Sequence, residues 1–174
     1  MPGSGSDAVA RVPLFERLVD NDGAASHEAR PYRIHDRQGL LNSVRNEVSR
    51  LLNTRCPRPE DPRDLNHRTV LDYGIPDFSP RSAVSETDRQ RLGDIIAKTV
   101  AAYEPRLSEV RVTLDPDPSH PLAALGRMEA VLRIGTFLEP VSFLLAFDPH
   151  TGAAAVRQEP SEPQPEGAVS TTET

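Results

Sequence analysis

The sequence lacks tryptophan, is poor in aromatic residues and contains a single cysteine. Aromatic residues make up 5% of its 174 residues, so a hydrophobic core must be built mainly from Leu, Val and Ile. The one cysteine, Cys56, excludes an intramolecular disulfide framework and fits a reducing compartment. No motif surrounds Cys56 and a proline follows it, so we do not assign it a catalytic role.

Long apolar runs and an excess of basic residues are also missing. No apolar stretch approaches the roughly 20 residues that a membrane-spanning helix needs. The N-terminus has no charged region followed by an apolar region, as a secretory signal peptide would have. The formal net charge of −6 argues against a generic nucleic-acid surface. These absences predict a soluble cytoplasmic protein that binds no nucleic acid and does not insert into a membrane.

Motifs for catalysis, metal binding and cofactor binding are absent as well. None of the five histidines stands at metal-ligand spacing from another histidine, a cysteine or an acid. The sequence has no glycine-rich phosphate loop and no serine nucleophile elbow. Two carboxylates could serve glycoside hydrolysis, for example Glu104 with Asp72 or Asp77. Because such a pair is easy to find among 26 acidic residues, we predict no catalytic residue, no metal and no cofactor.

What the sequence does contain begins with helical patterns. Residues 12–20 (VPLFERLVD) have helical spacing for one or two turns. Residues 36–55 form the first strong helix, with one apolar stripe made of Leu41, Val44, Val48, Leu51 and Leu52. Residues 56–86 are long for a structureless loop, so we expect an ordered, packed segment. Its expected apolar anchors are Val70, Leu71, Tyr73, Ile75 and Phe78.

A second helix follows and ends at a proline. It begins at the stretch SETDRQ, where Thr87 and Gln90 have the spacing of a capping box. We expect it to end near Tyr103, because Pro105 disfavours helical geometry at Glu104.

After this helix the hydrophobic period changes from about 3.6 to two, which is typical of half-buried strands. The predicted strands cover residues 108–114, 127–137, 141–148 and 153–158. The order of elements predicts an α+β fold, with N-terminal helices followed by a small antiparallel sheet of three or four strands. We expect a flexible N-terminus at 1–11, a single domain at 12–157 and a disordered, acidic, Pro-rich tail at 158–174.

The joint between helix and sheet carries the sequence Glu104-Pro105-Arg106. Pro105 pushes Glu104 into an extended conformation, in which residues two apart point to the same side. Glu104 and Arg106 should therefore form a rigid pair of opposite charges. Such a pair can hold a complementary group on another chain, and the alternative is a solvated turn. The edges of the small sheet are a second candidate contact, because an exposed edge can accept a partner strand.

Four stretches occur in a recognisable order: PLFERLVD, SVRNEVSRLLNTR, VLDYGIPDFS and YEPRLSEVRVTL. Together they resemble the TssE family, the baseplate wedge subunits of the bacterial type VI secretion system. That family belongs with the tailed-phage baseplate wedge protein, which is often labelled lysozyme-like. The resemblance covers roughly residues 12–157 and leaves out both ends of the chain.

The resemblance implies a role for each motif. Glu104, Pro105 and Arg106 would bind a partner, and the sheet from Val110 to Phe147 would receive the first layer of sheath subunits. The other two motifs would be structural, namely Leu51, Leu52, Asn53, Thr54 and Arg55 with Tyr73, Gly74, Ile75, Pro76 and Asp77. Implied partners are wedge subunits of the TssF, TssG and TssK type and sheath subunits of the TssB/TssC type. The expected location is the cytoplasmic side, at a baseplate docked on the inner membrane.

The lysozyme-like label leaves a hydrolase of peptidoglycan as the alternative function. A hydrolase needs an acid with a raised pKa, a second carboxylate and a cleft that binds sugar. Because the sequence has no tryptophan and few other aromatic residues to stack on sugars, we favour the structural role.

Overall fold

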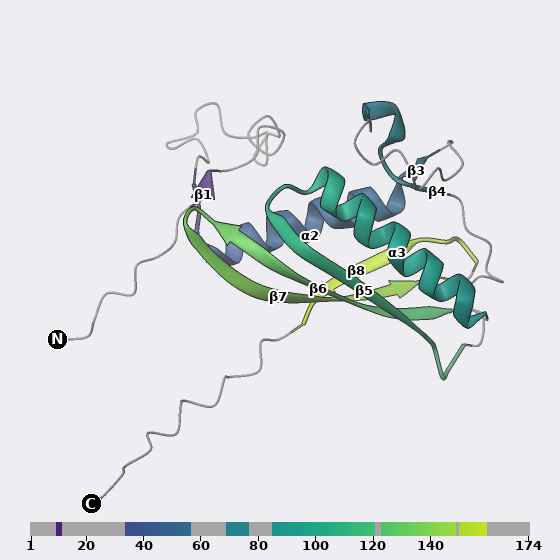
Figure 1. Ribbon diagram of the computed structural model, residues 1–174. Coiled ribbons are helices and arrows are strands. Elements are labelled where there is room, and N and C mark those ends of the chain that lie inside the picture. Colours follow the sequence, from purple (N-terminus) through teal and green to yellow (C-terminus); the bar gives the residue numbers. More distant parts are fainter. Residues whose placement is uncertain are drawn as a thin grey trace, which may run out of the picture.

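The computed structural model describes residues 10–11, 34–56, 69–76, 85–120, 123–148 and 150–159. Two helices lie on one face of a four-stranded antiparallel sheet, which confirms the α+β prediction (Figure 1). The elements are β1 (Ala10–Arg11), β2 (Ile34–His35), α2 (Arg37–Asn53), β3 (Arg55–Cys56), η2 (Val70–Asp72), β4 (Ile75–Pro76), α3 (Glu86–Tyr103), β5 (Leu107–Pro116), β6 (Ala124–Ile134), β7 (Phe137–Phe147) and β8 (Ala154–Gln158). Neither helix of these described ranges is long and apolar enough to cross a membrane.

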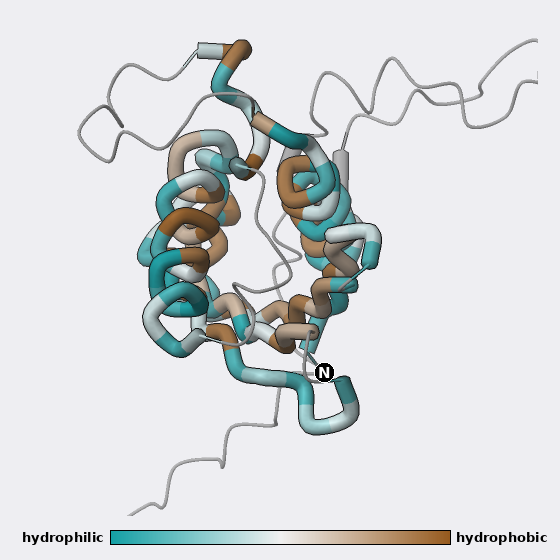
Figure 2. The backbone as a smooth tube through the Cα atoms, turned by 90° about the vertical axis from the view of Figure 1, so that its right-hand side faces the viewer, coloured by the Kyte–Doolittle hydropathy of each residue, from teal (hydrophilic) through white to brown (hydrophobic). Residues whose placement is uncertain are grey.

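Helix α2 buries the predicted stripe. Its N-cap is Asp36, whose side chain accepts a hydrogen bond from the backbone N–H of Gly39 at 2.6 Å. All five predicted residues are buried, and Leu40 and Ser43 are buried beside them. The helix ends at Asn53 and not at residue 55, because Thr54 is extended and the chain then enters β3. Figure 2 shows hydrophobic residues on the inner sides of the helices.

Helix α3 ends where it was predicted but begins with a different cap. Ser85 is the N-cap, and its hydroxyl accepts a hydrogen bond from the backbone N–H of Asp88 at 3.3 Å. The predicted capping box of Thr87 and Gln90 is therefore wrong. Gln90 instead donates to the side chain of Glu86, one turn earlier.

The sheet has the strand order β5-β6-β7-β8, with every neighbour antiparallel. The predicted alternation is confirmed, since Met128, Ala130, Leu132 and Ile134 of β6 are buried while the residues between them face outward or lie at intermediate depth. The predicted boundary between the second and third strands is wrong. Gly135, at φ +60°, and Thr136 form a tight turn, so β7 already begins at Phe137. Strand β8 reaches Gln158, one residue past the expected domain boundary at 157.

Between the helices the structure describes residues 54–56 and 69–76, and the hydrophobic anchor of this part is Ile75. Ile75 is fully buried, and Tyr73 packs edge-on against Tyr103 with ring centroids 5.2 Å apart. Burial raises the pKa of the Tyr73 hydroxyl. Val70 and Leu71, also predicted as anchors, are 87% and 69% exposed, so that prediction is wrong. They lie in η2, whose tight turn points them outward. Phe78 and residues 12–20 lie outside the described residues.

Candidate functional site

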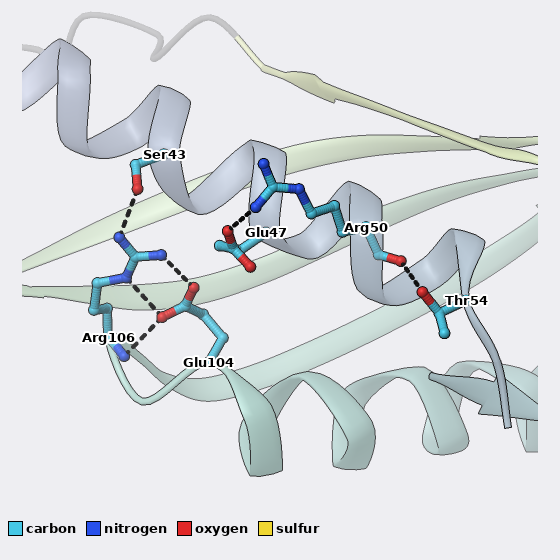
Figure 3. A network of polar contacts seen from close by, with 6 residues as sticks. All are labelled: Ser43, Glu47, Arg50, Thr54, Glu104 and Arg106. Atoms are coloured by element: carbon cyan, nitrogen blue, oxygen red, sulfur yellow. Dashed lines mark hydrogen bonds and ion pairs between the residues drawn. The ribbon is translucent and has the colours of Figure 1, made fainter. Parts of the chain in front are cut away.

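The candidate site lies where α3 passes into β5. Figure 3 shows the side chains of Glu104 and Arg106 directed toward each other. The chain between them is not the predicted extended segment but a turn, in which the N–H of Leu107 donates to the carbonyl of Glu104 at 3.1 Å. The pair is bidentate, with Arg106 Nε donating to Glu104 Oε1 at 2.7 Å and Nη2 donating to Oε2 at 2.5 Å. The backbone N–H of Arg106 also donates to Oε1, at 3.1 Å. The two side chains therefore hold each other.

A third side chain fixes the guanidinium from the opposite helix. Arg106 Nη1 donates to the hydroxyl of Ser43 on α2 at 2.8 Å, and Ser43 is buried. The backbone of Arg106 is fixed as well, because its carbonyl accepts from the N–H of Arg133 on β6 at 2.8 Å. Sequence reasoning missed Ser43, which is 63 residues from Arg106.

The two charged side chains of the site differ in burial: Glu104 is buried and Arg106 is partly exposed. The side chain of Glu104 is 5% exposed and that of Arg106 is 20% exposed, and Pro105 is exposed between them. The carboxylate is thus shielded from solvent, while one part of the guanidinium and the proline ring reach the surface. The arrangement can present Arg106 in a fixed orientation to an acidic group on another molecule.

The two predicted structural motifs lie side by side. Strand β3 pairs in parallel with β4, and the N–H of Ile75 donates to the carbonyl of Thr54 at 3.0 Å. Gly74 has φ +112°, and a Cβ there would lie 2.4 Å from the Thr54 oxygen. Only glycine permits this approach without strain. Asp77, the last residue of the second motif, lies outside the described residues.

The first motif also holds the last strand of the sheet. Asn53 Nδ2 donates to the carbonyl of Ala154 at 2.8 Å, and Asn53 Oδ1 accepts from the N–H of Ala154 at 2.9 Å. Arg55 donates to the carbonyl of Gly152 at 2.7 Å, just before β8. Hydrogen bonds from side chains at the end of α2 to backbone groups therefore hold the start of β8.

The turn before β8 has its own acidic anchor. Asp148 accepts hydrogen bonds from the backbone N–H groups of Thr151 and His150 at 2.7 Å and 2.8 Å. These bonds hold the pKa of the Asp148 carboxyl below its ordinary value. The bonds favour the ionised carboxylate, so the turn keeps its shape until strongly acidic pH.

We expect Asn53→Ala to lower the free energy of unfolding by about 2 kcal/mol, because two hydrogen bonds to the backbone of Ala154 and one to the carbonyl of Ser49 are lost. Urea denaturation monitored by circular dichroism measures this change. Asn46→Ala is the matched control, an exposed asparagine on the same helix, and should change stability by no more than about 0.5 kcal/mol. Equal effects of the two substitutions would contradict the proposed attachment of β8.

The two edges of the sheet differ. At β5, the backbone of α3 approaches so closely that a Cβ on Gly93 would lie 2.8 Å from the carbonyl oxygen of Val112. A bulge between Ser108 and Arg111, with Glu109 at φ +53°, further interrupts this edge.

The opposite edge is only half covered. Strand β8 pairs with residues 143–147 of β7, and one further bond joins the N–H of Glu159 to the carbonyl of Ser142. Arg133 and Leu138 lie opposite each other on β6 and β7. Because the N–H of Arg133 donates to Arg106 on the β5 side, Arg133 and Leu138 form a non-hydrogen-bonded pair. The backbone N–H and C=O of Leu138 therefore point away from β6. Among the described residues, no strand pairs with residues 137–141 on this side.

The sequence matches the model of a known protein family. The family model described as "Baseplate wedge protein gp25" matches residues 38–135, which is more than half of the chain. The chain belongs to this family. A chain of the solved structure "The baseplate complex from the type VI secretion system" is 21% identical, with a TM-score of 0.47 over 64% of this chain and 96% of that chain. No curated protein matches the sequence.

The baseplate wedge family is a family of structural proteins, and the match covers α2, α3, β5 and β6. Two of the three acids considered for a hydrolase have intramolecular partners, and the third, Asp77, lies outside the described residues. Glu104 is bound to Arg106, and Asp72 forms a capping box with Thr69 at the start of η2. The described residues contain no group of three or more His, Cys, Asp or Glu that could hold a metal ion.

Proposed function

We propose that this protein is a structural subunit of a type VI secretion baseplate, where it links the wedge to the contractile sheath and helps to start sheath assembly. Its membership of the baseplate wedge family carries the proposal. Its partners are wedge subunits of the TssF, TssG and TssK type and sheath subunits of the TssB/TssC type. It works in the cytoplasm, at a baseplate docked on the inner membrane.

Within this function, Glu104, Pro105 and Arg106 form the partner contact. The exposed parts are Pro105 and one side of the Arg106 guanidinium, so these touch the partner directly. Glu104 contributes by holding Arg106 in a single orientation, which lowers the conformational entropy lost on binding. The remaining motif residues keep β8 and the β3–β4 pair in place.

Co-purification tests this function. The full chain with an affinity tag should retain wedge subunits of the TssF and TssG type from cells that express the whole secretion system. Cells that lack the protein should form no fluorescent sheath, and the wild-type chain should restore it. Normal sheath assembly without the protein would contradict the proposal. Release of soluble fragments from purified peptidoglycan, lost in Glu104→Gln, would favour the hydrolase instead.

A further inference from the structure

One face of the four-stranded sheet carries no helix. Both α2 and α3 lie on the same side of the sheet, and within the described part of the chain no helix lies on the other side (Figure 1). Met128, Ala130 and Leu132 of β6 are buried toward the helices, so the residues that alternate with them lie on the bare side. The strand register extends this assignment to β7 and β8. We call the bare side the outer face.

The outer face consists of rows of residues that lie opposite one another on neighbouring strands. Four rows, in order along β6, are Leu125 with Ala146 and Ala155; Arg127 with Leu144 and Arg157; Glu129 with Ser142 and Glu159; and Val131 with Pro140. The first and fourth rows are apolar, the second carries two cations and the third carries two anions. Arg127, Glu129, Ser142 and Glu159 line one groove, so the second and third rows share this face.

The charges of the two central rows are only partly used within the chain. Arg127 pairs with Glu159 across β7 at 2.7 Å. Within the described ranges, Glu129 and Arg157 form no ion pair and no side-chain hydrogen bond. Leu144, which lies between the two cations, is 40% exposed. A surface that offers apolar groups, acids, bases and again apolar groups, in this order, would match the outer face.

A second copy of the same chain offers that order. A twofold axis that runs across the strands, between the second and third rows, exchanges these two rows. When two copies are placed face to face about this axis, Arg127 of each copy lies over Glu129 of the other, and Arg157 lies over Glu159. The apolar first row meets the apolar fourth row. A twofold interface must be complementary to itself in this way. An axis along the strands would instead place cations over cations, so the pattern selects one arrangement.

We propose that two copies of this chain pair through their outer faces and form a symmetric dimer. Sheets that pack face to face lie about 10 Å apart, with their strands within about 30° of each other, which keeps the rows in register. The contacts of Arg157 with Glu159 and of Arg127 with Glu129 each occur twice around the axis. The candidate site at the α3–β5 junction is not part of the outer face, so the pairing is independent of the proposed baseplate function.

The contact is small and leaves out β5. On β5, Glu109 and Asp115 would face each other, and their like charges keep this strand apart from its copy. Three strands and four rows, at about 4.8 Å between strands and about 3.4 Å per residue, give roughly 400 Å² per copy. Stable complexes bury about 800 Å² per partner, so we expect a weak dimer that forms at high protein concentration and low ionic strength.

Complementary charge reversals test the pairing in the full-length protein, by sedimentation equilibrium at low ionic strength up to submillimolar protein. The wild-type chain should form a reversible dimer. Arg157→Glu and Glu159→Arg should each lower the association constant at least about fivefold, because each variant faces like charges in its own dimer. An equimolar mixture of the two variants should restore association, because both contacts of the mixed dimer join opposite charges. Lys98→Glu, the same charge change as Arg157→Glu at an exposed residue of α3, should leave association unchanged.

A dimer that each reversal weakens and the mixture recovers is the result that supports this inference. Wild-type protein that stays monomeric at every concentration would overturn it. Equal association of the wild type and both reversal variants would place the contact elsewhere and overturn it as well. A mixture of the two variants that associates no better than each alone would refute the facing of Arg157 and Glu159.

Discussion

Replacing Glu104 by alanine is expected to lower the free energy of unfolding by about 2–4 kcal/mol and to abolish sheath assembly. The substitution removes both carboxylate partners of Arg106 and leaves a largely buried guanidinium with Ser43 as its remaining side-chain partner. Breaking a buried pair from one side costs about 3–5 kcal/mol, and the 20% exposure of Arg106 reduces this loss. Guanidinium chloride denaturation measures the stability, and fluorescence microscopy of tagged sheath measures assembly.

Two further variants separate stability from contact at this site. Glu47→Ala is the control, because Glu47 forms a partly exposed pair with Arg50 on α2 and such pairs contribute less than about 1 kcal/mol. Arg106→Lys keeps the positive charge but loses the planar fork, so it should impair sheath assembly even at temperatures where the protein remains folded. Wild-type sheath assembly in both Glu104→Ala and Arg106→Lys would refute the partner contact.

The second large effect is expected for Gly74→Ala, with a loss of about 3 kcal/mol or more. The new Cβ would lie 2.4 Å from the Thr54 oxygen, and a φ of +112° is strained for any residue with a side chain. Relief of this clash would separate β4 from β3 and withdraw Ile75 from the core. The midpoint of thermal unfolding, followed by circular dichroism, measures the effect.

Gly135→Ala provides the comparison for Gly74→Ala. Gly135 also has a positive φ, +60°, but a Cβ added there, in the β6–β7 turn, would meet no atom within 4 Å. Only the backbone conformation is then unfavourable, and the expected loss is about 1 kcal/mol. If both substitutions cost the same, the close contact of Gly74 with Thr54 is not what requires glycine there.

Local patterns predicted most of the regular elements. The apolar stripe of α2, the end of α3 before Pro105 and the alternation in β6 each follow from interactions between residues close in sequence. Whereas the structure forms the pair of Glu104 and Arg106 across a turn, the same reasoning predicted a rigid pair from an extended chain. It could not show that they bind each other, because their burial depends on the packing of α2 across the junction.

The contacts that the sequence did not reveal join distant residues. Asn53 meets Ala154 across 101 residues, and neither has a local feature that identifies the other. Val70 and Leu71 were expected to be buried because they are apolar. They belong to a tight turn that is anchored through neighbours, with the carbonyl of Thr69 accepting a hydrogen bond from the Tyr103 hydroxyl at 2.8 Å. Hydrophobicity alone does not show which apolar residues of a segment are buried, as Ile75 is, and which are exposed, as Val70 and Leu71 are.

The close approach of α3 to β5 at Gly93 makes the two edges of the sheet unequal. The β5 edge is covered at Val112 by the protein's own helix, so among the described residues the unpaired backbone lies on the β7 side, at residues 137–141. Copies of the protein cannot join edge to edge into an open fibre through β5.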